Sequence, residues 1–228
     1  MHFMGDRAAK DALYEGFAEV AKALASGRRA EIVDVLAQGD RSVDEIASEI
    51  DQSVANTSHH LRAMARAGLL TTRRDGTRIF YALASDRVGE LWSAMRDVAA
   101  EHTAGLERLV DAYLGERDGL DTIDRDELAR RVRRGDIVIL DVRPETEFSS
   151  GHIVGATSVP ILELRKHMKA LPKGAEVVAY CRGPYCVYAD DAVRMLNRRG
   201  YRARRLIDGF PEWKRAGLPV ASGEGASR

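Results

Sequence analysis

The hydrophobic pattern of the chain changes near residue 117, and this change divides the sequence into two parts that fold differently. Before it, apolar residues recur at helical spacing, as from Asp6 to Ala25. After it, short β-rich runs such as Glu176 to Tyr180 alternate with helical segments. We predict two domains: a mainly helical one over 1–116, a linker over 117–121, and an α/β domain with a mostly parallel sheet over 122–224.

The composition is that of a protein able to bury a core, with 45% hydrophobic and 31% charged residues among 228. No apolar run approaches the roughly 20 residues that span a bilayer, and the N-terminus lacks the apolar segment of a signal peptide. We therefore expect a cytoplasmic protein without membrane contact. The two cysteines, Cys181 and Cys186, are expected to be reactive or incidental rather than a structural disulfide.

Two short helices are predicted in the middle of the first half. Ser42 with Glu45 three residues later is a capping-box signature, which predicts a helix over Val43–Ile50. After a short turn, Ser53 can cap a second helix that runs to Ala67.

A hairpin and a long helix complete the first half. The run from Leu69 to Leu83 alternates like two strands, with Asp75-Gly76 as the expected turn. The last helix is expected to continue unbroken from Asp86 to about Leu114. Its apolar stripe exceeds what one small domain needs to cover, although ordinary packing onto its own domain is the alternative.

This order of helix, turn, helix and basic hairpin resembles the ArsR (SmtB-like) family of bacterial repressors. The resemblance depends on Val43-Asp-Glu-Ile-Ala, Thr57-Ser-His-His-Leu-Arg and Ala67-Gly-Leu-Leu, followed by the hairpin. It implies a winged helix-turn-helix that binds double-stranded operator DNA as a homodimer, through the first helix and the Asp86–Leu114 helix.

The second short helix is then the recognition helix, whose exposed polar side chains meet base edges, while the hairpin binds phosphates or the minor groove. From Gln52 to Tyr81 the only acid is Asp75, although such basic runs are as often solvated faces. Val54, Leu61 and Met64 are expected to face inward. The predicted DNA-contacting residues are Ser53, Asn56, Thr57, Ser58, His59, His60 and Arg62 on the helix, and Arg73, Arg74, Thr77 and Arg78 in the hairpin.

We expect no metal and no cofactor. Many family members sense metals through cysteines on the helix before the recognition helix, or through Asp and His pairs on the last helix. Val43 to Gln52 has no cysteine, and Asp97 and His102 have no further histidine after them to complete a site.

Three motifs of the second half together resemble a rhodanese (sulfurtransferase) domain over about residues 121–222. They are Leu140-Asp-Val-Arg-Pro-Glu-Thr-Glu-Phe with Gly151-His-Ile-Val-Gly-Ala, the loop Tyr180-Cys-Arg-Gly-Pro-Tyr-Cys186, and Leu206-Ile-Asp-Gly-Phe-Pro-Glu-Trp213. The resemblance implies that Cys181 is the catalytic nucleophile. It would accept sulfane sulfur as a persulfide from thiosulfate, polysulfide or a low-molecular-weight persulfide.

The position of Cys181 suits a nucleophile, because a strand is expected to end there and a helix to begin shortly after. Loop N–H groups and the helix N-terminus favour a thiolate, which we expect to be accessible at the rim of its pocket. A phosphatase is disfavoured because Val187 stands where a Cys-x5-Arg loop has its arginine. The loop residues expected to shape the site are Arg182, Gly183, Pro184 and Tyr185.

Four residues of the first rhodanese motif are expected to support this loop. Asp141 holds a neighbouring loop or pairs with Arg143, and Glu147 is expected to pair with Arg143 as well. His152 orders its turn rather than performing catalysis. For Cys186 two interpretations stay open: a resolving thiol that attacks a Cys181 persulfide, or a small buried residue in the first helical turn.

The two halves allow three functions. The first is a repressor whose fused domain reacts with sulfane sulfur and thereby changes DNA affinity. The second is a thiosulfate or persulfide sulfurtransferase with an accessory DNA-binding domain. The third is a catalytically inert interaction module. We expect some transferase activity under either of the first two.

Overall fold

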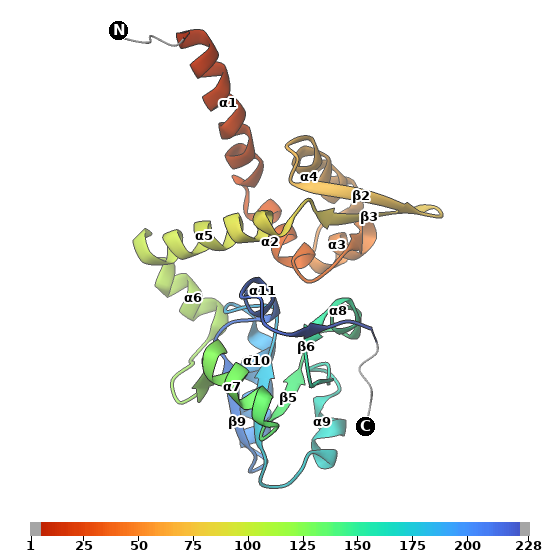
Figure 1. The fold of residues 1–228 in the computed structure, drawn as a ribbon, viewed down its shortest axis with the longest axis vertical. Helices are drawn as coiled ribbons and strands as arrows, with labels where there is room; N and C mark the ends of the chain where they lie inside the picture. The colour runs from red at the N-terminus through yellow and green to blue at the C-terminus, as the bar shows by residue number, and fades with distance from the viewer. Residues whose placement is uncertain (1–5, 224–228) are drawn as a thin grey trace. The chain divides into compact units, whose positions relative to one another are not determined.

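The computed structural model describes residues 6–223, and the chain forms two compact units divided between Ala94 and Met95 (Figure 1). The division falls inside helix α5 (Asp86–His102). The domain and linker boundaries expected at 116–122 stay predictions. In the part of the chain that the structure describes, no helix combines the length and apolarity that crossing a bilayer requires.

The first unit is mainly helical and follows the predicted order of elements. Its buried core includes Leu24, Ile32, Leu36, Ile46 and Leu61. Its helices are α1 (Arg7–Leu24), α2 (Gly27–Leu36), α3 (Val43–Glu49) and α4 (Val54–Arg66), and a short strand β1 (Arg41–Ser42) precedes α3.

Both predicted helix caps are confirmed. The Ser42 hydroxyl accepts a hydrogen bond from the Glu45 N–H, and the Glu45 carboxylate accepts one from the Ser42 N–H at 2.7 Å. The Ser53 hydroxyl accepts from the Asn56 N–H at 3.2 Å. These caps fix where α3 and α4 begin, because each provides a partner for a backbone N–H of the first turn.

The hairpin consists of β2 (Leu70–Asp75) and β3 (Arg78–Leu83), with β1 on the other side of β3. Because Asp75 pairs with Arg78, the turn is Gly76-Thr77, one residue later than predicted. Gly76 has a positive φ of 58°, which favours glycine at this position.

The prediction of a single helix from Asp86 to Leu114 is wrong. Helix α5 ends at His102, and a separate helix, α6, spans Leu106–Leu114. Between them Gly105 has a left-handed conformation, with φ of 85°. A continuous α-helix cannot contain this conformation, so the chain changes direction there.

The second unit is an α/β fold around a five-stranded sheet of order β4-β9-β8-β5-β7, in which every neighbouring pair is parallel. This confirms the predicted fold class. A small antiparallel pair, β6 (His152–Ile153) and β10 (Val220–Ala221), lies outside the main sheet. The strands of the sheet are β4 (Thr122–Ile123), β5 (Val138–Asp141), β7 (Ala156–Ser158), β8 (Glu176–Tyr180) and β9 (Arg202–Leu206).

Helices pack on both faces of this sheet, so its central strands are buried on each side. Along β8, Val177 and Ala179 share one apolar cluster with α10, whereas Val178 and Tyr180 share another with α7 and α11. The remaining elements are α7 (Arg125–Arg134), α8 (Glu145–Ser150), α9 (Leu164–His167), a 3-10 turn at Met168–Ala170, α10 (Val187–Asn197) and α11 (Phe210–Arg215).

Candidate functional site

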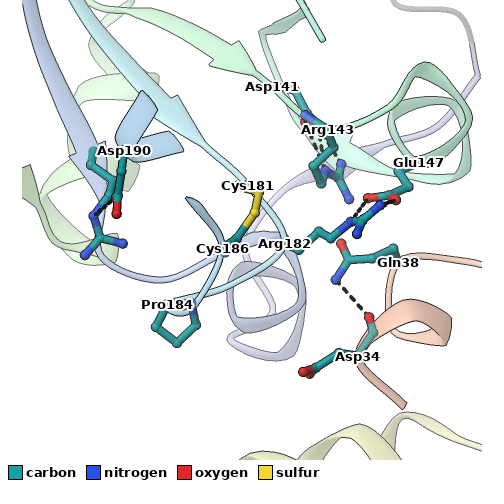
Figure 2. The surroundings of a disulfide bond; sticks show 12 residues. Asp34, Gln38, Asp141, Arg143, Glu147, Cys181, Arg182, Pro184, Cys186 and Asp190 are labelled. Atoms are coloured by element: carbon teal, nitrogen blue, oxygen red, sulfur yellow. Dashed lines mark hydrogen bonds and ion pairs between the residues drawn. A yellow bond between two sulfur atoms is a disulfide. The ribbon is translucent and has the colours of Figure 1, made fainter. Parts of the chain in front are cut away.

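The cysteine loop connects the carboxyl end of β8 to the start of α10, as the sequence predicted (Figure 2). Strand β8 lies between β9 and β5, so the loop leaves the middle of the sheet. Ligands of open parallel sheets bind at this carboxyl edge.

Cys181 and Cys186 are joined by a disulfide bond. Cys181 is 1% exposed and packs in the apolar cluster that contains Val177 and Ala179, whereas Cys186 is partly exposed. The expectation of an accessible, ionised Cys181 thiol is therefore wrong for this structure. The physical reason is the alternation of β8, which turns Cys181 toward α10.

The disulfide also shows that Cys186 can reach Cys181, as a resolving thiol has to do. Cys186 is also the N-cap of α10, and its N–H donates to the Gly183 carbonyl at 3.2 Å within the loop. The resolving role itself stays a prediction.

A glycine of the third motif, for which no role was predicted, packs directly against the loop. A Cβ atom at Gly209 would lie 2.2 Å from the Gly183 nitrogen, so only glycine fits. The next residue, Phe210, donates its N–H to the Cys181 carbonyl at 3.0 Å. The signal available in the sequence was the lone glycine of the third motif, because a glycine can mark a close approach of backbone.

Arg182 pairs with Glu147, where we expected Glu147 to pair with Arg143. The Arg182 Nη2 to Glu147 Oε1 distance is 2.6 Å (Figure 2). The Glu147 side chain is 3% exposed, so this ion pair holds the second loop residue against α8. Because its charge is compensated there, Arg182 neither points freely to solvent nor presents an isolated cation to a donor anion.

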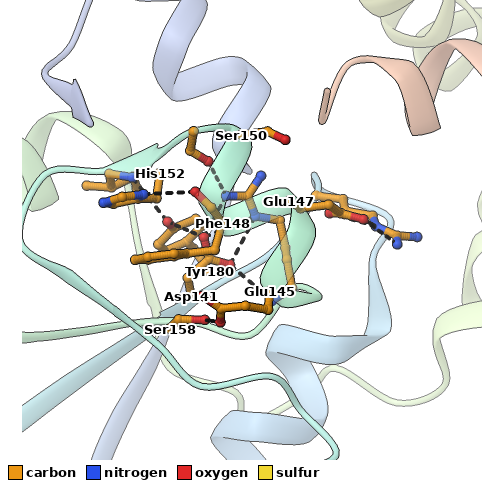
Figure 3. Close-up of polar contacts among 12 residues, drawn as sticks. Asp141, Glu145, Glu147, Phe148, Ser150, His152, Ser158 and Tyr180 are labelled. Carbon is orange, nitrogen blue, oxygen red and sulfur yellow. Dashed lines mark hydrogen bonds and ion pairs between the residues drawn. The ribbon is translucent and has the colours of Figure 1, made fainter. Parts of the chain in front are cut away.

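Asp141 and Arg143 form a fully buried ion pair, which confirms the predicted contact. The Arg143 Nη2 atom lies 2.6 Å from Asp141 Oδ2 and donates to the Gly151 carbonyl at 2.7 Å. The Tyr180 hydroxyl donates to Asp141 Oδ2 at 2.5 Å (Figure 3). Burial, followed by the negative charge of Asp141, raises the pKa of Tyr180 well above its usual value. This network connects the end of β8 to the turn after α8.

His152 has the surroundings of a residue that orders a turn. Its Nδ1 lies 2.9 Å from the Phe148 carbonyl oxygen, and its ring stacks on the Phe148 ring at 3.7 Å between centroids (Figure 3). The residue is 4% exposed, which keeps its ring away from solvent.

The second candidate site is the surface of α4, which presents most of the predicted DNA-contacting residues. Ser53, Asn56, His59 and Arg62 are exposed, whereas Ser58 and His60 are partly buried. Burial, aided by neighbouring positive charges, lowers the pKa of His60, which favours the uncharged ring.

Two assignments on α4 are wrong. Thr57 is 0% exposed, so it cannot contact DNA in this fold, and Val54, expected inside, is 44% exposed. Thr57, Leu61 and Met64 lie at spacings of four and three residues and share the buried face. Val54 is the first residue of the helix and lies beyond the edge of that face. The inward positions of Leu61 and Met64 are confirmed.

The hairpin presents Arg73, Arg74, Thr77 and Arg78 on its exposed surface. Arg73 lies 3.4 Å from Asp75 and over the Phe80 ring, 4.9 Å from its centroid. Ion pairs at such exposed positions are weak, so these arginines can exchange their present partners for phosphates at little expense.

The sequence matches two families, one in each unit. Residues 26–72 match the arsR family of bacterial regulatory proteins, and residues 124–216 match the rhodanese-like domain. Together with the fold, these matches define a class: a DNA-binding transcriptional regulator that combines a winged helix-turn-helix with a C-terminal rhodanese-like domain.

The chain belongs to the arsR family, in the form that carries this second domain. It is 44% identical over 214 residues to the HTH-type transcriptional regulator Rv0324 of Mycobacterium tuberculosis, which covers 94% of each chain. It is 33% identical to a sulfurtransferase of Allochromatium vinosum, over 45% of this chain and 96% of the relative.

A solved structure is similar to part of this chain. It is a winged helix-turn-helix DNA-binding domain from Mycobacterium bovis, described as homodimeric, with 42% identity and a TM-score of 0.41. The similarity covers 45% of this chain and 94% of that one.

Proposed function

We propose that this regulator binds operator DNA as a homodimer and that its rhodanese domain senses sulfane sulfur through Cys181 and Cys186. The observation that carries the proposal is the bonded pair of cysteines in the loop after β8. The sequence has no other cysteine, so thiol chemistry can enter the protein only at this loop.

The first step would be the transfer of one sulfur atom to Cys181. This step requires that reduction of the disulfide expose Cys181, which is 1% exposed in the oxidised form. Its thiolate then attacks the outer sulfur of thiosulfate. The bond between the two sulfur atoms of thiosulfate breaks, sulfite leaves with the electron pair, and Cys181 carries a persulfide. A polysulfide donor reacts in the same way and leaves shortened by one sulfur.

The second step would be the resolution of the persulfide by Cys186. The Cys186 thiolate attacks the inner sulfur of the Cys181 persulfide, hydrosulfide leaves, and a disulfide forms between the two cysteines. The disulfide in the structure supports this step, because it is the product that the step predicts. A dithiol reductant would then restore both thiols, attacking first at the more exposed Cys186.

Exposed apolar side chains support the dimer. On α1, Leu13, Tyr14 and Phe17 are each more than half exposed. On α5, Val98 is 59% exposed, and Leu91 and Met95 are exposed as well. Apolar groups at this density on a surface mark an interaction site. We infer that these two helices meet their counterparts in a second copy of the chain.

The test is operator affinity as a function of the state of the loop. A DNA fragment selected by the protein from a random pool would be titrated with reduced protein and with protein treated with polysulfide. We expect the affinity to change by about 5–150-fold, the usual range of allosteric coupling. The Cys181→Ser variant should bind with one affinity under both conditions; equal affinities for the treated and untreated wild type would refute the proposal.

A second candidate function, sulfur transfer with turnover, is favoured by the similarity to the Allochromatium vinosum sulfurtransferase. The two functions make opposite predictions for Cys186. If Cys186 resolves the persulfide, Cys186→Ser prolongs its lifetime and increases transfer from thiosulfate to cyanide. If instead Cys186 assists turnover, Cys186→Ser would slow the transfer of sulfur from thiosulfate to cyanide.

A further inference from the structure

An arginine outside the rhodanese match reaches into the cysteine loop. Arg117 belongs to the predicted linker, seven residues before the matched stretch begins at 124. Its Nη1 atom donates to the Pro184 carbonyl at 2.9 Å, and its Nε atom donates to Asp190 Oδ2 at 2.6 Å. Pro184 precedes Cys186 and Asp190 follows it, so one guanidinium contacts the chain on both sides of this partly exposed cysteine.

Asp190 has a second cationic partner besides Arg117. Its carboxylate is fully buried, and its other oxygen, Oδ1, lies 3.1 Å from the Nε atom of Arg205. Burial, followed by the positive charge of Arg117, lowers the pKa of Arg205. Two arginines thus share one carboxylate. Loss of Arg117 leaves Asp190 with a cationic partner, so the second unit is expected to fold without it.

A second arginine approaches the loop from α5. Arg96, which belongs to the second unit, donates to Glu212 Oε1 at 3.0 Å, and its guanidinium lies 5.5 Å from the centre of the Tyr185 ring. The other oxygen of Glu212 accepts from the N–H of Gly209, the residue that packs on the loop. Arg96 and Glu212 are 14% and 12% exposed, so water screens this ion pair only partly.

We propose that Arg117 is a positioning residue that ties the closed, disulfide form of the loop to the linker, with Arg96 as a second tie from α5. This inference rests on the proposed function only in taking Cys181 and Cys186 as a redox-active pair. The disulfide joins the two ends of the loop whose Pro184 carbonyl accepts a hydrogen bond from Arg117. Because linkage is reciprocal, a contact that is stronger in the closed loop also favours the disulfide.

The chemistry that reports on this contact is exchange with a dithiol. One thiolate of dithiothreitol attacks the Cys186 sulfur, the bond to Cys181 breaks, and Cys181 leaves as a thiolate. The second thiol of the reagent then attacks the mixed disulfide, releases Cys186, and closes the oxidised reagent into a ring. Two electrons pass from reagent to protein, and the equilibrium constant measures how strongly the fold favours the closed loop.

The experiment uses the full chain and four proteins: wild type, Arg117→Ala, Arg117→Lys and, as a matched control, Arg134→Ala on α7. Each protein is equilibrated with mixtures of reduced and oxidised dithiothreitol and its free thiols are alkylated. The fraction of disulfide is then measured by intact-protein mass spectrometry. We expect Arg117→Ala to lower the equilibrium constant for disulfide formation about tenfold, within the range of allosteric coupling. Arg117→Lys keeps a charge near Asp190 but lacks the fork that also reaches Pro184, so it should lie between wild type and alanine. Arg134→Ala should match the wild type.

Two results would overturn the inference. One is an equilibrium constant for Arg117→Ala equal to that of the wild type. The other is an equal change in Arg134→Ala. If Arg117→Ala failed to fold, Arg117→Lys would decide, and a wild-type constant for that variant would count against the contact. A purely structural role for Arg117 would lower stability alike in both forms of the loop and would leave the constant unchanged.

The outcome is separable from that of the proposed function. A wild-type protein that gains no sulfur from thiosulfate removes the sensing proposal, yet the effect of Arg117 on the disulfide equilibrium can still be present. An unchanged equilibrium in Arg117→Ala removes the inference about the linker and leaves the persulfide chemistry of Cys181 intact.

Discussion

The DNA-reading residues of α4 and the cysteine loop of the second unit differ in how firmly the fold holds them. On α4, the polar residues project from a capped helix and have few tertiary partners. The cysteine loop is fixed by Gly209, by the Arg182–Glu147 pair and by Arg117. A surface that adapts to DNA needs only a correctly placed helix. A reactive loop also needs packing contacts and ion pairs that fix the position of its side chains.

The largest effect should come from the buried ion pair beside the loop. Arg143→Met leaves the Asp141 carboxylate fully buried without its cation, and we expect a loss of about 3–5 kcal/mol in the free energy of unfolding. Denaturant unfolding of the chain measures it. The exposed pair of α1 is the comparison: Arg7→Met should change stability by no more than about 0.5 kcal/mol. Equal effects at the two sites would contradict the claim that buried contacts around the loop stabilise the fold more than exposed ion pairs on helices do.

The next largest effect is expected at Gly209. Its substitution by alanine would push a Cβ atom into the backbone of Gly183, and relief of that overlap should destabilise the second unit by about 1–3 kcal/mol. Thiol reactivity of Cys186 toward iodoacetamide in the reduced protein should rise in parallel. Gly16→Ala on α1 is the control, because nothing lies near its added Cβ and helical alanine is favoured by about 0.5–1 kcal/mol. A neutral Gly209→Ala would show that the loop is not held by this contact.

A smaller effect is predicted for the hairpin. Arg78→Ala should weaken binding to all DNA sequences by about 1 kcal/mol and reduce the salt dependence of log K by about 1, because a phosphate contact carries no sequence information. Fluorescence anisotropy at several salt concentrations measures both quantities. Arg134→Ala, in the second unit, should leave the salt slope unchanged. A loss of affinity confined to one DNA sequence would instead indicate that Arg78 contacts a base.

The smallest effect concerns Thr57. Its hydroxyl oxygen is buried and has no hydrogen-bond partner in the described part of the chain, so Thr57→Val should preserve or slightly raise stability, by less than about 1 kcal/mol. DNA affinity should not change, whereas Asn56→Ala, at an exposed position, should weaken binding to the preferred sequence. Reduced DNA affinity in Thr57→Val with normal stability would restore Thr57 to the DNA-contacting set.

Local chemistry explains which predictions from the sequence were confirmed. The helix starts at Ser42 and Ser53 follow from side chains that bond their own first turn, so a few neighbouring residues determine them. The position of the cysteine loop follows from the change from strand to helix around Cys181. The break at Gly105 was missed because a lone glycine within an apolar stripe is compatible with either a continuous or an interrupted helix.

The contacts of the loop could not be read from the sequence, because its partners are distant along the chain. Glu147 was expected to pair with Arg143, four residues before it in the same motif. Its partner is Arg182, 35 positions away, because α8 packs against the loop. Arg117 reaches Asp190 across 73 positions, and no local pattern predicts such a pair. Val54 and Thr57 were assigned to the wrong faces because helical spacing fixes relative positions, while the edge of the core depends on neighbouring elements.

The most direct test is the intact mass of reduced wild type, Cys181→Ser and Cys186→Ser after brief exposure to polysulfide. If a persulfide forms on Cys181 and Cys186 removes it, Cys186→Ser should retain the mass of one added sulfur atom. Wild type should instead lose two hydrogens to a disulfide, and Cys181→Ser should gain no sulfur. Added sulfur in Cys181→Ser equal to that in Cys186→Ser would contradict the assignment of Cys181 as the acceptor.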